Sequence, residues 1–340
     1  MSKFTKKRWF IGFDISKDTF NAALLHDQTP ESFKETVFTN NLNGFESMLQ
    51  WLSSQKIVLS ESLFCMEHTG NYGLLLFAWL SQKEIDFCVE PGLEIKQSLG
   101  MIRGKNDPVD ARRIATYAFI KRMKLKPFIL PAKILIQIKQ LLTYRDQLVR
   151  IRTGLKNSLK SHQQYQQVSD LQFVVQDIQQ QVEQQAERID QVEKQIKEII
   201  ESEEGLKCNF NLATSVKGIG FVIAAFMLVT TNNFTSFDNG RKYACYIGTA
   251  PFGNTSGTSI KAKPRVSHLA NKRMKTLFSN GANSAKSWDP EIKAYYKRKI
   301  EEGKEHKLII NAISCKLVNR VFAVVNRKTP YVTIYGNNFA

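Results

Sequence analysis

The chain of 340 residues has little cysteine and no apolar run long enough to span a bilayer. Its five cysteines are widely spaced, without a Cys-x-x-Cys or Cys/His cluster. This pattern excludes a disulfide framework and the usual zinc sites, so we expect buried, reduced thiols. The basic N-terminus lacks the apolar length and cleavage pattern of a signal peptide. We therefore expect a cytoplasmic protein that makes no membrane contact.

Acidic residues are also scarce compared with basic ones. Lys and Arg number 48 against 31 Asp and Glu, which gives a formal net charge of +17. Such an excess favours a polyanionic partner, with nucleic acid as the first candidate and an anionic membrane surface as the weaker one. The length and a hydrophobic content of 43% indicate a folded protein of two or three domains.

Residues 1–130 alternate between strand-like and helix-like patterns. We expect strands at 10–16, 21–26, 34–39, 63–68 and 86–91, and helices at 44–52, 73–83 and 107–122. Strands in succession, followed by alternating strands and helices, predict an α/β domain with a mixed sheet.

Four acidic residues occupy three distinctive settings in this domain. Asp14 and Glu67 each come at the end of a short apolar run, where a buried strand would end. Asp107 and Asp110 are spaced i, i+3 at the start of the last predicted helix, so both carboxylates share one face. Carboxylates from two strands and a helix would form a site for hard divalent cations in phosphoryl transfer. Each residue taken alone is more simply a turn former or helix cap.

A helical region follows, because residues 134–204 contain no proline and only one glycine. Apolar residues recur there every seven positions, which is typical of coiled coils. One series is Ile134, Leu141, Leu148 and Leu155; the other is Val168, Val175, Val182, Ile189 and Ile196, accompanied by Leu171, Ile178, Val192 and Ile199. Gln185 interrupts the second set, and a lone polar core residue can fix register. We predict two helices separated near residues 161–167 within a region 131–205, either as an internal hairpin or as a dimer interface.

Residues 206–340 form a third predicted region. The segment 214–229 has the glycine spacing of a helix-hairpin-helix turn, where Lys217 and backbone amides near Gly218 and Gly220 would contact DNA phosphate. The alternative is an ordinary tight turn. A Gly/Ser/Thr loop at 253–259 precedes a basic cluster, which we interpret as a phosphate-binding surface and not merely a solvated face. The cluster comprises Lys261, Lys263, Arg265, Lys272, Arg273 and Lys275.

The motifs GFDISK (12–17), MEHTGNY (66–72) and KNDPVDA (105–111) together resemble the DEDD transposases of bacterial insertion sequences, the insertion-sequence-110 and 1111 family. The resemblance covers nearly the whole chain. It implies a RuvC-like N-terminal domain of the RNase H fold, a coiled coil, and a mainly helical C-terminal transposase domain. It also implies a structured guide RNA (bridge RNA), element-end and target DNA as substrates, and a homodimer or tetramer associated with the bacterial nucleoid.

The resemblance assigns a role to each matching residue. Asp14, Glu67, Asp107 and Asp110 would hold Mg²⁺, with Mn²⁺ as the alternative ion. Ser256 in NTSGTS would be the nucleophile, with Ser259 as the second candidate because the loop holds two serines. Serine attack would then give a covalent phosphoserine while the ions steady the leaving 3′ oxygen. The chain departs from the family after the serine, where VSHLANKRM contains His268 and Ala270 in a stretch that commonly carries Lys and Gly.

Three other functions compete with this interpretation. A RuvC-type structure-specific endonuclease would use the acidic residues with water as nucleophile and leave the Ser-Gly loop without a role. An actin-like sugar kinase would need a Gly/Thr-rich turn after the first strand, which is absent, and the net charge does not suit it. A non-catalytic nucleic-acid-binding coiled-coil protein would use the carboxylates only as caps.

Overall fold

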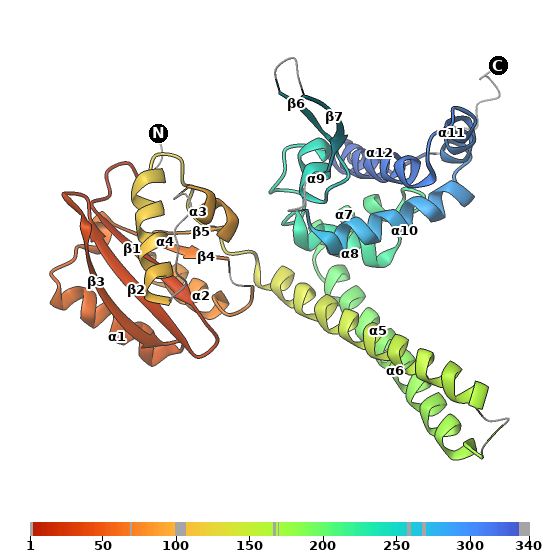
Figure 1. Cartoon of the computed structure of the whole chain (residues 1–340), viewed down its shortest axis with the longest axis horizontal. Coiled ribbons are helices and arrows are strands. Elements are labelled where there is room, and N and C mark those ends of the chain that lie inside the picture. Colours follow the sequence, from red (N-terminus) through yellow and green to blue (C-terminus); the bar gives the residue numbers. More distant parts are fainter. Residues whose placement is uncertain are drawn as a thin grey trace. The chain divides into compact units, whose positions relative to one another are not determined.

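The computed structural model describes residues 3–68, 70–98, 107–165, 168, 170–256, 260–266 and 270–332, with backbone only at 107, 108 and 252–265. The chain forms two compact units, Met1–Leu130 (unit 1) and Pro131–Ala340 (unit 2). Figure 1 shows a sheet with helices in unit 1, and helices with a small β-hairpin in unit 2. The finer division of the second part at residue 205 stays a prediction.

Unit 1 contains a five-stranded mixed sheet in the order β3-β2-β1-β4-β5. The strands are β1 (Trp9–Ile15), β2 (Thr19–His26), β3 (Thr29–Thr39), β4 (Ser62–Glu67) and β5 (Phe87–Glu90). β1 and β2, and β2 and β3, pair antiparallel, whereas β1, β4 and β5 run parallel. All five expected strands are confirmed, as is the mixed sheet.

Two helices cover each face of this sheet. α1 (Leu42–Ser54) and α2 (Leu74–Gln82) pack on the face formed by Ile11 and Phe13, whereas α3 (Gly92–Ser98) and α4 (Asp107–Lys121) pack on the face formed by Phe10 and Cys65. Successive side chains of a strand point to opposite faces, so β1 contributes to both cores. The three expected helices are confirmed, and α3 and a short 3₁₀ turn at Leu59–Glu61 were not predicted.

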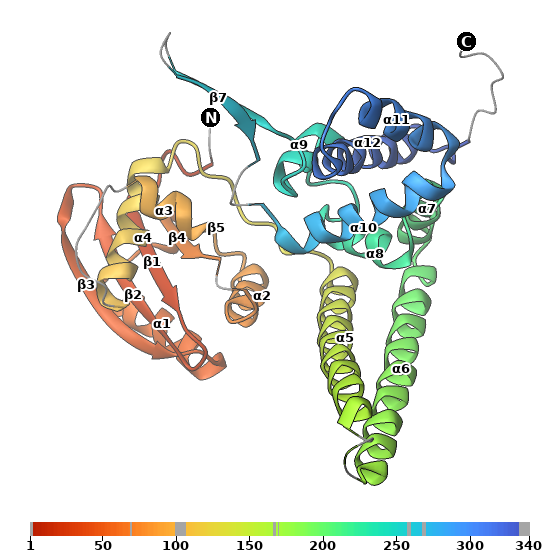
Figure 2. The same ribbon diagram turned by 45° about the vertical axis from the view of Figure 1, so that its right-hand side comes forward.

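Unit 2 begins with an antiparallel helical hairpin of α5 (Lys133–Tyr165) and α6 (Gln172–Glu201), which Figure 2 shows side by side. The predicted pair of helices is confirmed, and their apolar stripes pack against each other within the chain. The buried stripe consists of Leu135, Ile138, Leu142 and Leu148 of α5 with Ile189, Val192, Ile196 and Ile200 of α6, and Leu206 of α7 (Glu204–Thr214) and Ala225 and Leu228 of α8 (Phe221–Thr230) belong to the same core. Arg145 of α5 adds an ion pair with Glu193 of α6 at 2.6 Å. The internal-hairpin alternative therefore accounts for the heptads.

The structure corrects both heptad series in detail. In the first series only Leu148 is fully inside the core. Leu135, Ile138 and Leu142 form the centre of the contact face, and Ile134 and Leu141 pack against it partly buried. In the second series Val168 is 87% exposed, because α6 begins only at Gln172. Helices of 3.6 residues per turn drift from a strict seven-residue repeat, which explains the shift along α5.

Gln185 places a polar side chain in the apolar heptad series of α6, as the sequence indicated. The side chain is half-buried, and its Oε1 has no hydrogen-bond partner among the described residues. A polar group in such a position lowers stability but disfavours other registers.

Helices form most of the remainder of unit 2. These elements are α7 (Glu204–Thr214), α8 (Phe221–Thr230), α9 (Gly240–Tyr246), β6 (Phe252–Ser256), β7 (Ile260–Arg265), α10 (Lys272–Trp288), α11 (Pro290–Glu301) and α12 (His306–Arg327). Tyr243, Phe278 and Leu317 lie in one core shared by α9, α10 and α12. The mainly helical second part is confirmed. The expected loop at 253–259 is wrong in part, because residues 253–256 belong to β6, which pairs antiparallel with β7, and residues 257–259 lie outside the described residues.

α12 is long and apolar enough to cross a membrane by length and composition, the only such helix among the described residues. Its apolar side chains instead form the centre of unit 2, where Ile313, Leu317, Val318 and Val321 are fully buried. A mostly buried helix of this composition is typical of a protein core.

Candidate active site

Three carboxylates lie in a row across neighbouring parallel strands of unit 1. Phe13 of β1 is in register with Met66 of β4, so Asp14 and Glu67 follow at the same level. Glu67 is paired in turn with Glu90 of β5. Residues in register on parallel strands point to the same face of a sheet. The structure therefore places Asp14 and Glu67 at strand ends, as the sequence predicted, and adds Glu90 beside them.

Gly12 allows α4 to approach this row closely. A Cβ atom at Gly12 would lie 2.2 Å from the backbone oxygen of Ala111 and 2.3 Å from the backbone nitrogen of Ala115. Gly12 and Asp14 are two residues apart in β1, so they face the same side of the sheet. Asp110 directly precedes Ala111, and the close crossing therefore brings the start of α4 to the face that carries Asp14.

The two aspartates of α4 are described to different extents. Asp110 is half-buried and accepts a hydrogen bond from Nη1 of Arg113 at 2.8 Å, an ion pair one turn along the helix. Asp107 begins α4, and its side chain lies outside the described residues. The structure thus describes the side-chain positions of three of the four predicted acidic residues, Asp14, Glu67 and Asp110.

Glu67 lies against the beginning of α3. A Cβ atom at Gly92 would come within 1.9 Å of Oε1 of Glu67, so the carboxylate occupies the space that glycine leaves open. A larger residue at position 92 would displace this carboxylate from the row. The glycine therefore helps to position Glu67 at the strand end.

Glu90 and Tyr117 were missed by the sequence analysis. The hydroxyl of Tyr117 in α4 donates to Oε2 of Glu90 at 3.3 Å. Burial raises the pKa of Glu90, the Tyr117 hydrogen bond opposes that rise, and the charge of Glu94 adds to it. The pKa of Tyr117 is also raised, first by burial and then by the charge of Glu90. An acid ending the apolar run 86–90 was the same signal that identified Asp14 and Glu67.

The donor chemistry of this face suits a hard divalent ion, because carboxylate oxygens are its preferred ligands. Among the side chains that the structure describes, no group of three Asp, Glu, His or Cys residues converges closely enough to hold an ion. The Asp107 carboxylate, a predicted ligand, is not in that set.

Ser256 lies on the β6–β7 hairpin of unit 2. It is the last residue of β6 and pairs with Ile260 of β7. Ser259 and His268 lie outside the described residues, as do the side chains of Ser256, Lys261, Lys263 and Arg265. The backbone therefore places Ser256 at the end of β6, opposite the first residue of β7, and its predicted chemical role stays a prediction.

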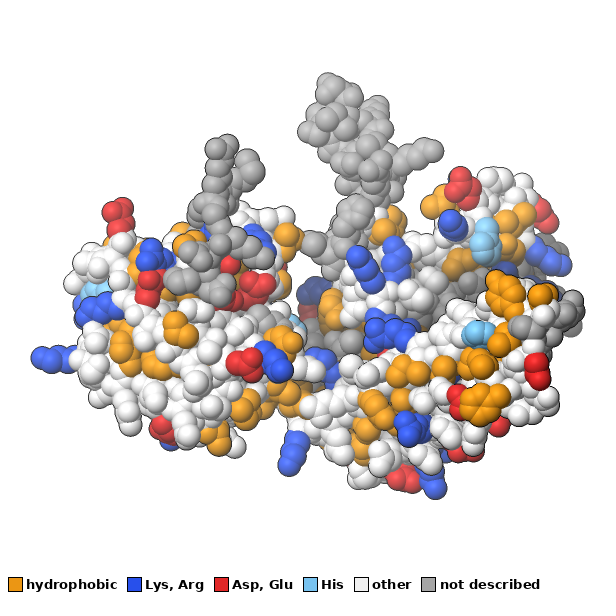
Figure 3. All heavy atoms as spheres, turned by 60° about the horizontal axis from the view of Figure 1, so that its bottom comes forward, with side chains coloured by type: hydrophobic (Ala, Val, Ile, Leu, Met, Phe, Trp, Pro, Cys, Tyr) orange, Lys and Arg blue, Asp and Glu red, His pale blue; other side chains and the backbone are white. Residues whose placement is uncertain are grey.

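The other predicted basic contacts differ in their surroundings. Arg273 forms an ion pair with Asp146 of α5, and its guanidinium lies 5.6 Å from the ring centre of Phe226. Part of its function is therefore to join α10 to the helical hairpin. Lys272 and Lys217 are exposed, and Lys275 is half-buried. Figure 3 shows that Lys and Arg side chains form several separate groups on one face of the protein.

The two glycines of the predicted helix-hairpin-helix turn have different roles. Gly218 has a φ of +93°, and a Cβ atom there would lie 2.5 Å from the backbone oxygen of Gly281 in α10. Gly218 is thus required for packing. Gly220 precedes α8, and a Cβ atom at this position would have no neighbour within 4 Å among the described residues. No side chain from the described residues caps α8, and its open amide groups keep the predicted phosphate contact feasible.

Comparison with known proteins gives matches on both units. A family model of the DEDD transposases of IS110, described as "Transposase", matches residues 11–165. A second model, described as "Transposase IS116/IS110/IS902 family", matches residues 211–297. The first match contains all four predicted acidic residues, and the second contains Ser256.

Individual relatives show the same similarity. Two proteins named "Pilin gene-inverting protein", from Moraxella lacunata and Moraxella bovis, are each 28% identical over 95% of this chain and 97% of their own length. The "Insertion element IS110 uncharacterized 43.6 kDa protein" of Streptomyces coelicolor is 31% identical over 35% of this chain and 29% of its own length. Since both family models name the same group, the chain belongs to the IS110 family of transposases, enzymes that cut and rejoin DNA, and this family points to dependence on a divalent metal ion.

Proposed function

We propose that this transposase is an RNA-guided recombinase that exchanges DNA strands through a serine nucleophile and a carboxylate-bound divalent ion. The observation that carries the proposal is the row of Asp14 and Glu67 at neighbouring strand ends, with α4 held against it through Gly12. The mixed sheet covered by helices on both faces supports an RNase H-like, RuvC-like fold for unit 1.

The acidic residues would bind the ion and orient the substrate. Asp14, Glu67, Asp107 and Asp110 supply oxygen ligands, and Mg²⁺ is the proposed ion because it prefers a few carboxylates and keeps room for phosphate oxygens. When bound, the ion would polarise the scissile phosphate and stabilise charge on the leaving oxygen. The ion pair with Arg113 restrains the Asp110 carboxylate at the start of α4, which helps to orient it as a ligand.

Ser256 would supply the attacking oxygen. Its Oγ forms a bond to phosphorus while the bond from phosphorus to the 3′ oxygen breaks, and the serine proton passes to a basic group or to water. The 3′ oxygen leaves as a hydroxyl after taking up a proton. The phosphodiester bond is thereby conserved as a phosphoserine ester, so no ATP is needed for rejoining.

Rejoining reverses these steps with a different strand. A 3′ hydroxyl of the partner strand attacks the phosphoserine, a new phosphodiester forms, and the serine hydroxyl is regenerated. The near full-length similarity to proteins named for gene inversion supports strand exchange over simple cutting, because inversion needs rejoined ends. Inversion or insertion of a DNA segment is therefore the proposed outcome.

The remaining parts of the proposal concern partners. A structured guide RNA would select the DNA, element ends and target sites would be the substrates, and the enzyme would act in the bacterial cytoplasm at the nucleoid. The net charge of +17 supports polyanionic partners. A homo-oligomer would bring two DNA sites together, through surfaces other than the buried stripe of the α5–α6 hairpin.

The serine is tested by trapping the covalent intermediate. Wild-type protein with labelled element-end DNA, guide RNA and Mg²⁺ is denatured during turnover, and a protein–DNA adduct is expected. Ser256→Ala should form no adduct while DNA and RNA binding stay within about twofold, because one hydroxyl contributes little to an electrostatic interface. Ser259→Ala is the matched control, a hydroxyl deletion three residues away.

Each result decides between the alternatives. Cutting by the wild type without any adduct would make water the nucleophile and favour the RuvC-type endonuclease. An adduct lost in Ser259→Ala and kept in Ser256→Ala would move the nucleophile by three residues. Binding without cutting under all conditions would favour a non-catalytic protein.

A further inference from the structure

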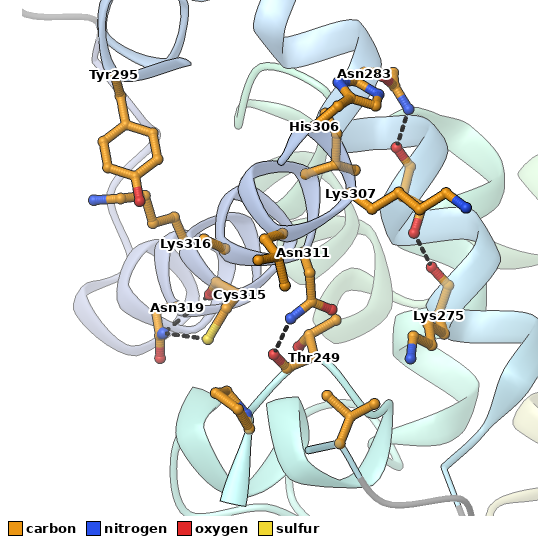
Figure 4. A pocket seen from close by; sticks show the side chains of 16 residues that line it. Thr249, Lys275, Asn283, Tyr295, His306, Lys307, Asn311, Cys315, Lys316 and Asn319 are labelled. Carbon is orange, nitrogen blue, oxygen red and sulfur yellow. Dashed lines mark hydrogen bonds between the residues drawn. The ribbon is translucent and has the colours of Figure 1, made fainter. Parts of the chain in front are cut away.

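A groove of about 1050 Å³ lies in unit 2 beside the stem of the hairpin that carries Ser256. Thr249 and Pro251 precede β6 and line the groove, and Val266 follows β7 and lines it too. The remaining walls come from α10, α11 and α12, as Figure 4 shows. The groove therefore lies between the helices of unit 2 and the base of the hairpin, where the chain enters β6 and leaves β7.

Two helices present polar side chains along this groove at regular spacing. Lys275, Ser279 and Asn283 recur every four residues on α10, so they lie on one helix face. Asn311, Cys315 and Asn319 have the same spacing on α12. The groove is thus bounded by two polar stripes on different helices.

The asparagines along the groove keep hydrogen-bonding capacity. Asn311 donates through Nδ2 to the backbone oxygen of Thr249 at 2.8 Å, Asn283 to that of Ser279 at 2.9 Å, and Asn319 to that of Cys315 at 3.0 Å. Asn283 and Asn311 each have a second N–H and an Oδ1 acceptor, whereas Asn319 also contacts Sγ of Cys315 through Nδ2 at 3.8 Å. These Oδ1 atoms accept no hydrogen bond from the described part of the chain.

The charge at the groove is of one sign. Lys275, Lys307 and Lys316 line it, and none of its described lining residues is acidic. Apolar groups of Pro251, Val266 and Leu308 form other parts of the wall, and Leu308 is 61% exposed although it lies in a helix. The site therefore offers apolar surface, amide groups and positive charge together.

We propose that this groove binds an unpaired, single-stranded segment of the DNA strand whose phosphate Ser256 attacks, at the opposite end of β6 from that phosphate. Lysines suit phosphate oxygens, and apolar walls with amide groups suit the faces and edges of bases. A duplex exposes mainly its phosphates, so only unpaired bases would reach such walls. The volume of about 1050 Å³ lies just above the range of about 300–1000 Å³ for small-ligand sites, enough for more than one nucleotide.

This inference rests on the proposed function for its location, since Ser256 defines the reacting phosphate. It adds a substrate requirement, because strand exchange needs DNA ends that have left the duplex. DNA is favoured over RNA because the groove adjoins the hairpin with the serine, where the DNA strand is cut.

The test measures binding of the full-length protein to fluorescent single-stranded DNA of about ten nucleotides, within the usual range of single-strand sites. The same sequence as duplex DNA and as single-stranded RNA provides the comparison. Ala312→Trp should fill the groove and weaken single-strand DNA binding at least about tenfold, with duplex binding unchanged. Leu308→Gln should act in the same direction without affecting folding, because this side chain is exposed.

Charge removal provides a matched pair. Lys307 lines the groove and Lys297 on α11 does not, and both are exposed. Lys307→Gln should reduce the slope of log affinity against log salt by about 0.7 for single-stranded DNA, the value for one phosphate contact. Lys297→Gln should leave that slope unchanged. The melting temperature of every variant checks folding.

Equal losses for single-stranded and duplex DNA in Ala312→Trp and Leu308→Gln would overturn the proposal, as would equal slopes for the two lysine variants. Stronger binding of the RNA strand, lost in the same variants, would assign the groove to RNA and also overturn it. Ser256→Ala should bind the single strand like wild type. A groove that behaves as predicted in a protein that forms no adduct would uphold this inference while rejecting the nucleophile.

Discussion

Units 1 and 2 position polar groups by different structural means. In unit 1, strand register aligns Asp14, Glu67 and Glu90 on one face of a sheet that is buried on both sides. In unit 2, the four-residue spacing on α10 and α12 aligns the polar side chains of the groove. Strand register in a sheet brings together residues that are far apart in the sequence, whereas helix periodicity places residues only four positions apart on one face. The acidic site therefore depends on the pairing of strands, and the groove depends on how two helices pack.

The largest expected effect is on the strand-end carboxylates. Asp14→Asn should reduce DNA cleavage by at least about a thousandfold, because loss of an ion ligand removes several kcal/mol of transition-state stabilisation. Asp18→Asn, the same change at an exposed position after β1, should leave cleavage unchanged. Cleavage is measured on labelled element-end DNA with Mg²⁺. Normal cleavage by Asp14→Asn would remove the acidic row from the mechanism and leave unit 2 as the whole site.

The next effect concerns the helical hairpin of unit 2. Ile196 is fully buried between α5 and α6, so Ile196→Ala should lower the free energy of unfolding by about 2–5 kcal/mol. Val182→Ala, in the same heptad series but half-buried, should cost less. Chemical denaturation and sedimentation are measured together. If Ile196→Ala instead splits an oligomer without loss of monomer stability, the stripe lies between chains and not within one.

A smaller effect separates the two glycines of the turn before α8. Gly218→Ala should lower the free energy of unfolding by about 1–3 kcal/mol for two reasons. The new methyl group would collide with the backbone of Gly281, and residue 218 has a positive φ that alanine adopts only with strain. Gly220→Ala should keep stability and weaken DNA binding if a phosphate approaches the open start of α8. Thermal melts and DNA titrations distinguish the two. Equal melting temperatures would mean that Gly218 has no packing role.

The smallest effect is a pH dependence at Glu90. Burial raises its pKa in the folded state, so the ionised carboxylate is destabilising there. The protonated side chain therefore contributes stability below the pKa of the unfolded state, about 4.3. This contribution is lost as pH rises through the raised pKa of the folded state. Glu90→Gln should therefore become more stable than wild type as pH increases through this window. Denaturation with a chelator present is the measurement, and an equal difference in stability between Glu90→Gln and wild type at every pH would contradict the prediction.

Prediction from sequence succeeded where a local pattern carries the information. Short apolar runs with strand-like patterns identified all five strands, and heptads identified α5 and α6. Asp14 and Glu67 were placed at strand ends because each ends an apolar run. The pattern failed at Val168, since an apolar residue can precede a helix and stay exposed. It also failed at residues 253–256, where a predicted loop is part of β6 and pairs with β7.

The sequence by itself determined the α/β character of unit 1, the helical character of unit 2, the net positive charge and the acidic motifs of the family. Only the tertiary structure decided that Glu90 joins the row of Asp14 and Glu67, that Gly12 brings α4 against it, and that the heptads close within the chain. The reason is physical: periodicity reports which face of an element avoids water, but the partner of that face is chosen by packing between elements distant in sequence.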